Sequence, residues 1–153
     1  MKPIRYNVLL IEQDSSVTDF AQLAAVESFP EINLTVIGSG DAILECINGS
    51  IDRNNKKPHI ILLDMNFPKL DGLAVLRSLR MQANACDIPV VAFSSVYTQD
   101  DVLISYQVGA NSFVPKPVDS EQFKELFGQR LDYWFQLHQD ETVSVTGHAV
   151  DQL

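Results

Sequence analysis

The chain contains 153 residues, and its 20 acidic side chains outnumber its 11 basic ones, so its formal net charge at pH 7 is −9. With a sequence pI near 4.6, it would be repelled by a phosphate backbone, which argues against nucleic acid as a partner. Hydrophobic residues make up 46% of the chain and charged residues 20%, as in packed globular domains. We therefore expect one domain with one sizeable core.

The longest aliphatic runs, residues 8–11 and 60–63, contain four residues each, far fewer than the roughly 18 that suggest a membrane span. The N-terminal region lacks the apolar segment of a secretory signal. These observations predict a cytoplasmic protein that does not contact a membrane. Cys46 and Cys86 lack the spacing of a metal site, and we interpret them as ordinary thiols.

Five short apolar segments alternate along the chain with stretches of helical periodicity. The predicted strands are residues 7–12, 34–38, 59–64, 88–94 and 112–115. Between and after them, apolar residues recur three and four positions apart, as Phe123, Leu126 and Phe127 do. The first, third and fourth segments are continuously apolar, which is typical of central parallel strands covered on both faces. The pattern predicts an α/β fold with a doubly wound, five-stranded parallel sheet.

Several helix boundaries have recognisable capping residues. Asp14 is placed to cap the first helix, although it could instead turn inward as a metal ligand. Asp71 is placed to open the helix after the third strand, and Gly109 to close the next helix. Asp119 and Gln122 have the spacing of a capping box at the start of the last helix.

The periodic pattern stops near residue 138. The remaining segment, residues 139–153, has three acidic side chains and no Lys or Arg. We therefore divide the chain into a folded domain, residues 1–138, and an acidic, mobile C-terminal tail, residues 139–153.

Polar side chains follow the predicted strands at the points where the strands end. They are Glu12, Gln13 and Asp14 after the first, Asp64 and Asn66 after the third, Ser94 at the end of the fourth, and Lys116 after the fifth. If the strand order is 2-1-3-4-5, these ends are neighbours at the carboxyl edge of the sheet, where parallel α/β folds bind ligands. Carboxylates, a hydroxyl and an ammonium group would then surround one point.

This set of groups suits the transfer of a phosphoryl group to a carboxylate. Asp64 can act as the nucleophile and form an aspartyl phosphate. Mg²⁺ held by oxygen ligands would offset the charge of the phosphoryl oxygens. Lys116 would pair with one phosphoryl oxygen, and the Ser94 hydroxyl would donate a hydrogen bond to another. The alternative is that Asp64 is a structural carboxylate at a strand end.

The sequence resembles the receiver domain of two-component response regulators, the family of the chemotaxis receiver protein. The resemblance spans about residues 6–137 and rests on four motifs, at residues 9–12, 61–72, 91–95 and 116–117. It implies a flavodoxin-like (βα)₅ fold in which a sensor histidine kinase phosphorylates Asp64 and Lys116 is the invariant lysine. It also implies that Ser94 and Phe113 are the switch residues, and that the peptide bond between Lys116 and Pro117 is cis.

The same resemblance implies the metal ligands and shows one departure from the family pattern. The ligands of Mg²⁺ would be Glu12, Gln13, Asp64 and the backbone carbonyl of Asn66. Receivers carry two acids at the end of the first strand, and the second, which ligates the metal directly, aligns with Gln13. An amide oxygen can still coordinate a hard cation, but the site loses one negative charge. We therefore expect weaker cation binding than in a receiver with both acids.

A narrower similarity suggests a partner and an interface. Residues 105–113 and the aromatic end of the last helix are similar to stand-alone regulators that partner cyanobacterial phytochromes. Those regulators receive phosphate from a light-regulated histidine kinase and associate through the fourth helix, fifth strand and fifth helix. The predicted interface consists of Ile104, Tyr106, Tyr133, Trp134 and Phe135, which would form a two-fold homodimer. The alternative is that the tail folds back and covers the apolar surface.

The function predicted from the sequence is a stand-alone response regulator of a two-component phosphorelay. Residues 138–153 are too few for a folded output domain, so signalling would depend on protein contacts, and the only reactions promoted would be its own phosphorylation and dephosphorylation. One alternative is a phosphorylation-independent pseudo-receiver adaptor, because Gln13 replaces an acid. Another is a flavodoxin-like cofactor binder, against which the lack of a Gly-rich phosphate loop after the first strand argues.

Overall fold

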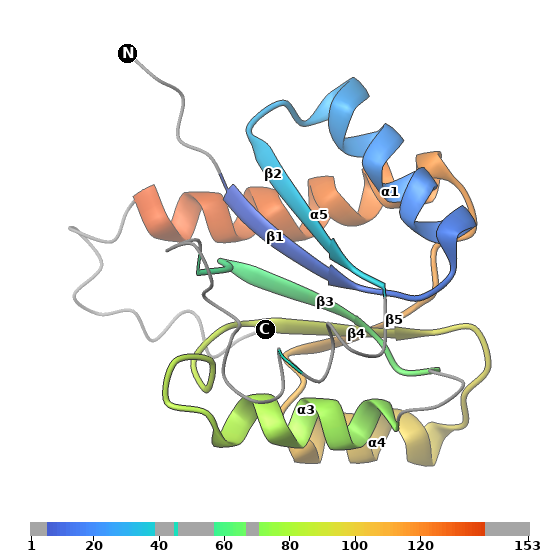
Figure 1. Ribbon diagram of the computed structural model, residues 1–153, viewed down its shortest axis with the longest axis vertical. Helices are drawn as coiled ribbons and strands as arrows, with labels where there is room; N and C mark the ends of the chain where they lie inside the picture. The colour runs from blue at the N-terminus through green and yellow to red at the C-terminus, as the bar shows by residue number, and fades with distance from the viewer. Residues whose placement is uncertain (1–5, 39–44, 46–56, 67–70, 140–153) are drawn as a thin grey trace.

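In the computed structural model, the chain folds around one parallel β-sheet (Figure 1). The structure describes residues 6–38, 45, 57–66 and 71–139, with residues 130–139 described by their backbone alone. The strands are β1 (Tyr6–Ile11), β2 (Ile32–Ile37), β3 (Ile60–Asp64), β4 (Val90–Ser94) and β5 (Ser112–Pro115), and the helices are α1 (Ser15–Ser28), α3 (Gly72–Met81), α4 (Gln99–Val108) and α5 (Ser120–Gln139). The strand order is β2-β1-β3-β4-β5. The predicted doubly wound sheet and its order are therefore confirmed.

The sheet is the middle of three layers, with α1 and α5 on one face and α3 and α4 on the other (Figure 1). Because successive side chains of a strand point to opposite faces, a continuous apolar strand supplies both layers. In β1, Val8 and Leu10 belong to the cluster under α1 and α5, whereas Leu9 and Ile11 belong to the cluster under α3. The unbroken apolar runs in the sequence thus reflect two hydrophobic cores separated by one sheet.

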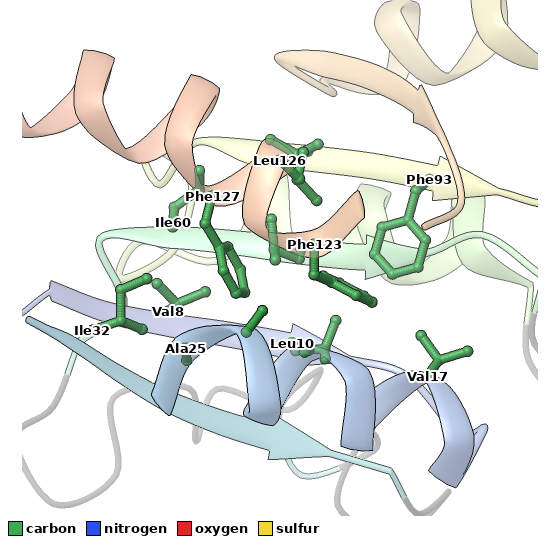
Figure 2. Close-up of a cluster of buried hydrophobic side chains, with 14 residues drawn as sticks. Val8, Leu10, Val17, Ala25, Ile32, Ile60, Phe93, Phe123, Leu126 and Phe127 are labelled. Carbon is green, nitrogen blue, oxygen red and sulfur yellow. The ribbon is translucent and has the colours of Figure 1, made fainter. Parts of the chain in front are cut away.

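The larger side chains of α5 fill the core beside α1 (Figure 2). Phe123 and Phe127 are almost completely buried, their ring centroids lie 5.8 Å apart, and Leu126 is also buried. The three residues whose helical spacing the sequence shows thus form the buried face of α5. Burial of such side chains contributes roughly 1.5–3 kcal/mol each, so this layer holds α5 firmly against the strands that end at the polar edge.

The predicted helix caps are present. The Asp14 carboxylate accepts a hydrogen bond from the Ser16 N–H at 2.9 Å, and Asp71 accepts one from the Leu73 N–H at 3.0 Å. Gly109 ends α4 with φ of 133°, a conformation that side chains with a Cβ rarely adopt. Asp14 therefore has the capping role rather than the alternative role of an inward-turned ligand.

The chain between β5 and α5 differs in two details from the sequence-based expectation. Asp119 accepts from the Gln122 N–H at 2.9 Å, but the Gln122 side chain accepts from the Val118 N–H rather than from that of Asp119. The peptide between Lys116 and Pro117 is trans, so the predicted cis bond is wrong. The free-energy difference between the isomers of an X–Pro bond is only about 0.5–1 kcal/mol, so the surrounding fold decides the isomer.

None of the helices in the described part of the chain is long and apolar enough to span a membrane. Most of the predicted tail, residues 140–153, lies outside the described residues. The division into a folded domain and a tail therefore stays a prediction.

Candidate functional site

Three charged side chains from three different strand ends meet at the carboxyl edge of the sheet. Glu12 follows β1, Asp64 ends β3, and Lys116 follows β5. The Lys116 Nζ atom lies 3.0 Å from Glu12 Oε1 and 3.2 Å from Asp64 Oδ2. Only 1% of Glu12 and 2% of Asp64 are exposed. The structure therefore brings together the two acids and the lysine that the sequence placed at strand ends.

Parallel pairing of the strands explains why these side chains meet. Ile11 of β1 lies opposite Leu63 of β3, so the next residue of each strand, Glu12 and Asp64, falls in adjacent positions. The Lys116 N–H donates to the backbone carbonyl of Ser94 at 3.0 Å, which extends the pairing of β4 and β5 by one step. Backbone hydrogen bonds thus position the site before any side-chain contact is made.

Two acidic side chains are buried close together in this site, which disfavours their charged forms. Burial raises the pKa of Glu12 to about 7, and the Asp64 carboxylate adds to the rise, although the Asp14 N–H and Lys116 oppose it. Burial alone would lower the pKa of Lys116, but the carboxylates of Glu12 and Asp64 outweigh it, so the net direction is upward. Lys116 is therefore held as a cation, while two acids share its single charge.

The oxygen atoms at this edge fit a hard divalent cation. Glu12 Oε2 accepts a hydrogen bond from the Asp14 N–H at 3.0 Å. Glu12 Oε1 is buried and has no aligned hydrogen-bond donor among the described residues, so its 3.0 Å contact with Lys116 is an ion pair by distance. Gln13, half-buried beside Glu12, can add an amide oxygen. Carboxylate and carbonyl oxygens are the ligands of Mg²⁺.

The number of acids at this edge is small for a metal site. Within the described ranges, no three His, Cys, Asp or Glu side chains gather closely enough to hold a metal ion. Gln13, the residue after Glu12, has a neutral amide side chain and adds no carboxylate to Glu12 and Asp64. The donor set therefore fits a divalent cation, but with less negative charge than three acids would supply.

Asn66 connects Asp64 to the loop that follows β4. The Asn66 N–H donates to Asp64 Oδ1 at 2.9 Å. The side-chain oxygen of Asn66 accepts hydrogen bonds from the Ser94 hydroxyl and, at 3.2 Å, from the Ser95 N–H. The Ser94 hydroxyl also lies 2.8 Å from the carbonyl oxygen of Val96. Sequence reasoning considered only the backbone carbonyl of Asn66, and an amide two residues after Asp64 was the available signal for a side-chain role.

A cavity of about 140 Å³ lies beside Ser94 and Phe113. Its lining also includes Tyr97, whose ring centroid lies 5.1 Å from that of Phe113 in an edge-to-face arrangement. Ser94 is buried and Phe113 is half-buried. The two predicted switch residues therefore adjoin one cavity. Sequence reasoning missed Tyr97, and an aromatic residue three positions after Ser94 was the signal that could have identified it.

The predicted interface is described only in part. Ile104 is 39% exposed and Tyr106 is 46% exposed on α4. The Tyr106 hydroxyl also accepts a hydrogen bond from the Phe113 N–H at 3.1 Å, which ties α4 to β5. The other predicted members, Tyr133, Trp134 and Phe135, lie outside the described side chains.

Comparison with known proteins identifies the class to which this fold and site belong. Residues 8–127 match the family model of the response regulator receiver domain, so the chain belongs to the receiver domains of response regulators. The family resemblance drawn from the sequence is thereby confirmed.

The similar proteins include phytochrome response regulators. The response regulator Rcp1 of Synechocystis sp. is 30% identical over 121 residues, which cover 78% of this chain and 80% of Rcp1. The phosphorylated cyanobacterial phytochrome response regulator RcpA superposes with a TM-score of 0.72 at 25% identity, covering 86% of this chain and 94% of RcpA. The bacteriophytochrome response regulator RtBRR gives 0.64 at 32% identity, covering 82% and 77% of the two chains. These proteins are relatives by sequence and fold.

Proposed function

We propose that this protein is a stand-alone response regulator whose Asp64 accepts a phosphoryl group from a sensor histidine kinase. The observation that carries the proposal is the buried Asp64 carboxylate, with one oxygen 3.2 Å from the Lys116 ammonium and the other accepting the Asn66 N–H at 2.9 Å. A purely structural strand-end carboxylate would not need a half-buried lysine shared with a second acid. The site instead holds a nucleophile beside the positive charge that an incoming phosphoryl group requires.

The transfer forms one bond and breaks one. An oxygen of Asp64 bonds to phosphorus while the bond between phosphorus and the phosphohistidine nitrogen breaks, and that nitrogen keeps the electron pair. Lys116 stays beside the carboxylate and pairs with a phosphoryl oxygen, which reduces the repulsion between the incoming group and the two acids. The buried position limits access of water to the aspartyl phosphate.

Glu12, Gln13, Asp64 and the backbone carbonyl of Asn66 would hold Mg²⁺ in this site. Such a cation supplies charge neutralisation for the phosphoryl oxygens. The Oε1 atom of Glu12 supports this choice, because it is buried without an aligned hydrogen-bond donor among the described residues.

The switch would operate through Ser94 and Phe113. A phosphoryl oxygen on Asp64 accepts a hydrogen bond from the Ser94 hydroxyl, and the loop between β4 and α4 moves with Ser94. The cavity of about 140 Å³ that Ser94 and Phe113 both line gives the Phe113 ring room to repack. Phosphorylation thus shifts the population between two packings of the surface formed by α4, β5 and α5.

We place the protein in the cytoplasm and assign it a phytochrome-type histidine kinase as partner. The support for the partner is the sequence similarity to Rcp1 at 30% identity and the structural similarity to the phytochrome response regulators RcpA and RtBRR. Output would occur through protein contacts, and the protein would promote only its own phosphorylation and dephosphorylation.

The decisive test is the intact mass of the purified protein after incubation with Mg²⁺ and a small phosphodonor such as acetyl phosphate. We expect the wild type to gain one phosphoryl group and Asp64→Asn to gain none, because an amide cannot form the acyl phosphate. A wild type without added mass at any Mg²⁺ concentration would contradict the proposal. Labelling that persists in Asp64→Asn would show that the phosphoryl group is on another residue.

The second candidate is a pseudo-receiver adaptor that uses the same surface without phosphate. The observation that favours it is the neutral Gln13, which leaves the edge without a group of three acids among the described residues. The Mg²⁺ titration separates the two functions, because an adaptor would show no phosphorylation even at high Mg²⁺ while still binding its partner.

We further propose that the regulator forms a homodimer through α4, β5 and α5. The exposed side chains of Ile104 and Tyr106 on α4 support this choice of surface. Ile104→Glu should shift the sedimentation weight toward the monomer, because a charge would be buried at the interface. The matched control is Leu23→Glu, which changes a 46% exposed residue of α1; equal effects of both variants would remove the assignment.

A further inference from the structure

Asn66 contacts both the proposed phosphorylation site, Asp64, and the segment that would respond to it, Ser94 and Ser95. Its backbone N–H donates to Asp64 Oδ1 at 2.9 Å, and its side-chain oxygen accepts from the Ser94 hydroxyl and from the Ser95 N–H. The first contact belongs to the backbone and survives any ordinary substitution. The other two depend on the amide side chain, so they can be removed separately.

The Ser94 hydroxyl is held in a position that competes with phosphoryl binding. A hydroxyl has one hydrogen to donate, and two acceptors flank it here, the Asn66 side-chain oxygen and the carbonyl oxygen of Val96 at 2.8 Å. Phosphoryl oxygens only accept hydrogen bonds. The Ser94 hydrogen must therefore turn away from these two acceptors before it can be donated to a phosphoryl group on Asp64.

The hydrogen bond to Ser95 extends this restraint to the backbone of the loop. The Ser95 N–H lies 3.2 Å from the same Asn66 oxygen, so one acceptor fixes a side chain and a main-chain group of neighbouring residues. The loop leads directly to Thr98, which caps α4 through a reciprocal pair of hydrogen bonds with Asp101. The Asn66 contacts therefore restrain the start of a loop whose other end is held by the cap of α4.

We propose that the Asn66 side chain is a positioning residue that holds Ser94 and Ser95 in the unphosphorylated arrangement and so restrains phosphorylation of Asp64. This role rests on the proposed phosphotransfer function. It belongs to the side chain of Asn66, which contacts Ser94 and Ser95, and not to its backbone N–H, which contacts Asp64. The amide acts through Ser94 and does not touch the transferred group.

The test compares rates of phosphorylation by acetyl phosphate at fixed Mg²⁺, followed by intact mass. Asn66→Leu keeps a similar shape and both backbone groups but removes the acceptor. The rate should rise roughly two- to tenfold, the factor that corresponds to the loss of one neutral hydrogen bond from the starting state. In a Ser94→Ala background, Asn66→Leu should have no effect, because the restrained hydroxyl is already absent.

The matched control is Thr98→Ala, which loosens the start of α4 in the same loop without touching Ser94, and it should leave the rate at the wild-type level. A rate in Asn66→Leu at or below that of the wild type, while the wild type is labelled, would overturn the positioning role alone. An increase of equal size in the Ser94→Ala background or in Thr98→Ala would also overturn it. A wild type that takes no phosphoryl group would overturn the proposed function and this role with it.

An independent measurement uses no phosphate. The Ser95 amide should exchange its hydrogen with solvent faster in Asn66→Leu than in the wild type, by at least severalfold, because its acceptor is removed. The amide of Val102, bonded within α4 to the carbonyl of Thr98, provides the internal reference. Unchanged exchange at Ser95 would contradict the restraint on the loop, whatever the phosphorylation rates show.

Discussion

Two polar clusters lie at opposite edges of the sheet, and they differ in how completely their groups are paired. At the carboxyl edge, the two carboxylates of Glu12 and Asp64 share the single charge of Lys116. At the amino edge, the hydrogen bonds that the Arg80 guanidinium donates within the described residues go to neutral carbonyl and amide oxygens. Both clusters join several strands and helices, so position in the fold does not distinguish them.

Arg80 reaches from the last turn of α3 to the beginnings of β4 and β5. Its nitrogens donate to the carbonyl oxygens of Ile88 and Gly109, each at 2.8 Å, and to the side-chain oxygen of Asn111 at 2.9 Å. The Asn111 oxygen accepts in addition from the Val90 N–H at 2.9 Å. Each group in this cluster has a partner of matching chemistry, as expected for a network that stabilises the fold.

In the cluster at the carboxyl edge, not every polar group has a matching partner. The pKa of Glu12 is raised to about 7, first by burial and further by Asp64, and its Oε1 has no aligned donor among the described residues. Such an arrangement lowers stability, and under the proposed function its oxygens would bind a cation and a phosphoryl group. In this protein, the satisfied network stabilises the fold, whereas the unsatisfied one lies at the proposed phosphorylation site.

The largest effect on stability is expected at the satisfied cluster. Arg80→Met should lower the free energy of unfolding by about 3 kcal/mol, because several carbonyl and amide oxygens lose charge-assisted hydrogen bonds while partly buried. Urea denaturation at pH 7 measures the change. Arg77→Met, an exposed position on the same helix, is the control and should change little. Equal losses in both variants would show that the Arg80 contacts contribute nothing specific.

The next effect is expected from charge at the unsatisfied cluster. Gln13→Asp should lower the Mg²⁺ concentration for half-maximal phosphorylation roughly tenfold, because one more carboxylate charge contributes on the order of 1–2 kcal/mol at the cation. Gln13→Asn keeps the length of aspartate without its charge and should not lower the requirement. If the two variants behave alike, side-chain length rather than the missing charge explains the role of Gln13.

The smallest effect is a pH-dependent gain in stability. The pKa of Glu12 is about 7 in the folded chain against an ordinary value of 4.5, so the folded state binds the proton more tightly. When a chelator removes metal ions, the contribution of Glu12 to the free energy of unfolding is present below about pH 4.5 and is lost as the pH rises through about 7. Glu12→Gln removes that loss and should be about 1 kcal/mol more stable than the wild type at pH 8.

Urea denaturation at pH 5 and pH 8 tests this prediction by comparing the free energy of unfolding of Glu12→Gln with that of the wild type. The gain should be larger at pH 8 than at pH 5, and saturating Mg²⁺ should reduce it, because the cation stabilises the wild type, with its additional carboxylate charge, more than the variant. A variant that is less stable than the wild type at pH 8 would place Glu12 among the satisfied, structural groups.

The sequence determined the fold of this protein and the types of residue in its site. Unbroken apolar strands require a cover on both faces, which leads to the observed sheet, and four of the five strands are followed by or end in an acid, a hydroxyl or a lysine in the sequence. The caps at Asp14, Asp71 and Gly109 could be predicted for the same reason, since each depends on residues close in the chain.

Only the tertiary structure decided how those groups are paired. That Lys116 lies between two carboxylates, that the Asn66 amide holds Ser94, and that Tyr97 packs on Phe113 depend on distances between segments far apart in sequence. The trans peptide before Pro117 was decided in the same way. Periodicity and capping are local and can be read from neighbours, whereas desolvation and charge pairing depend on every element that closes around a group.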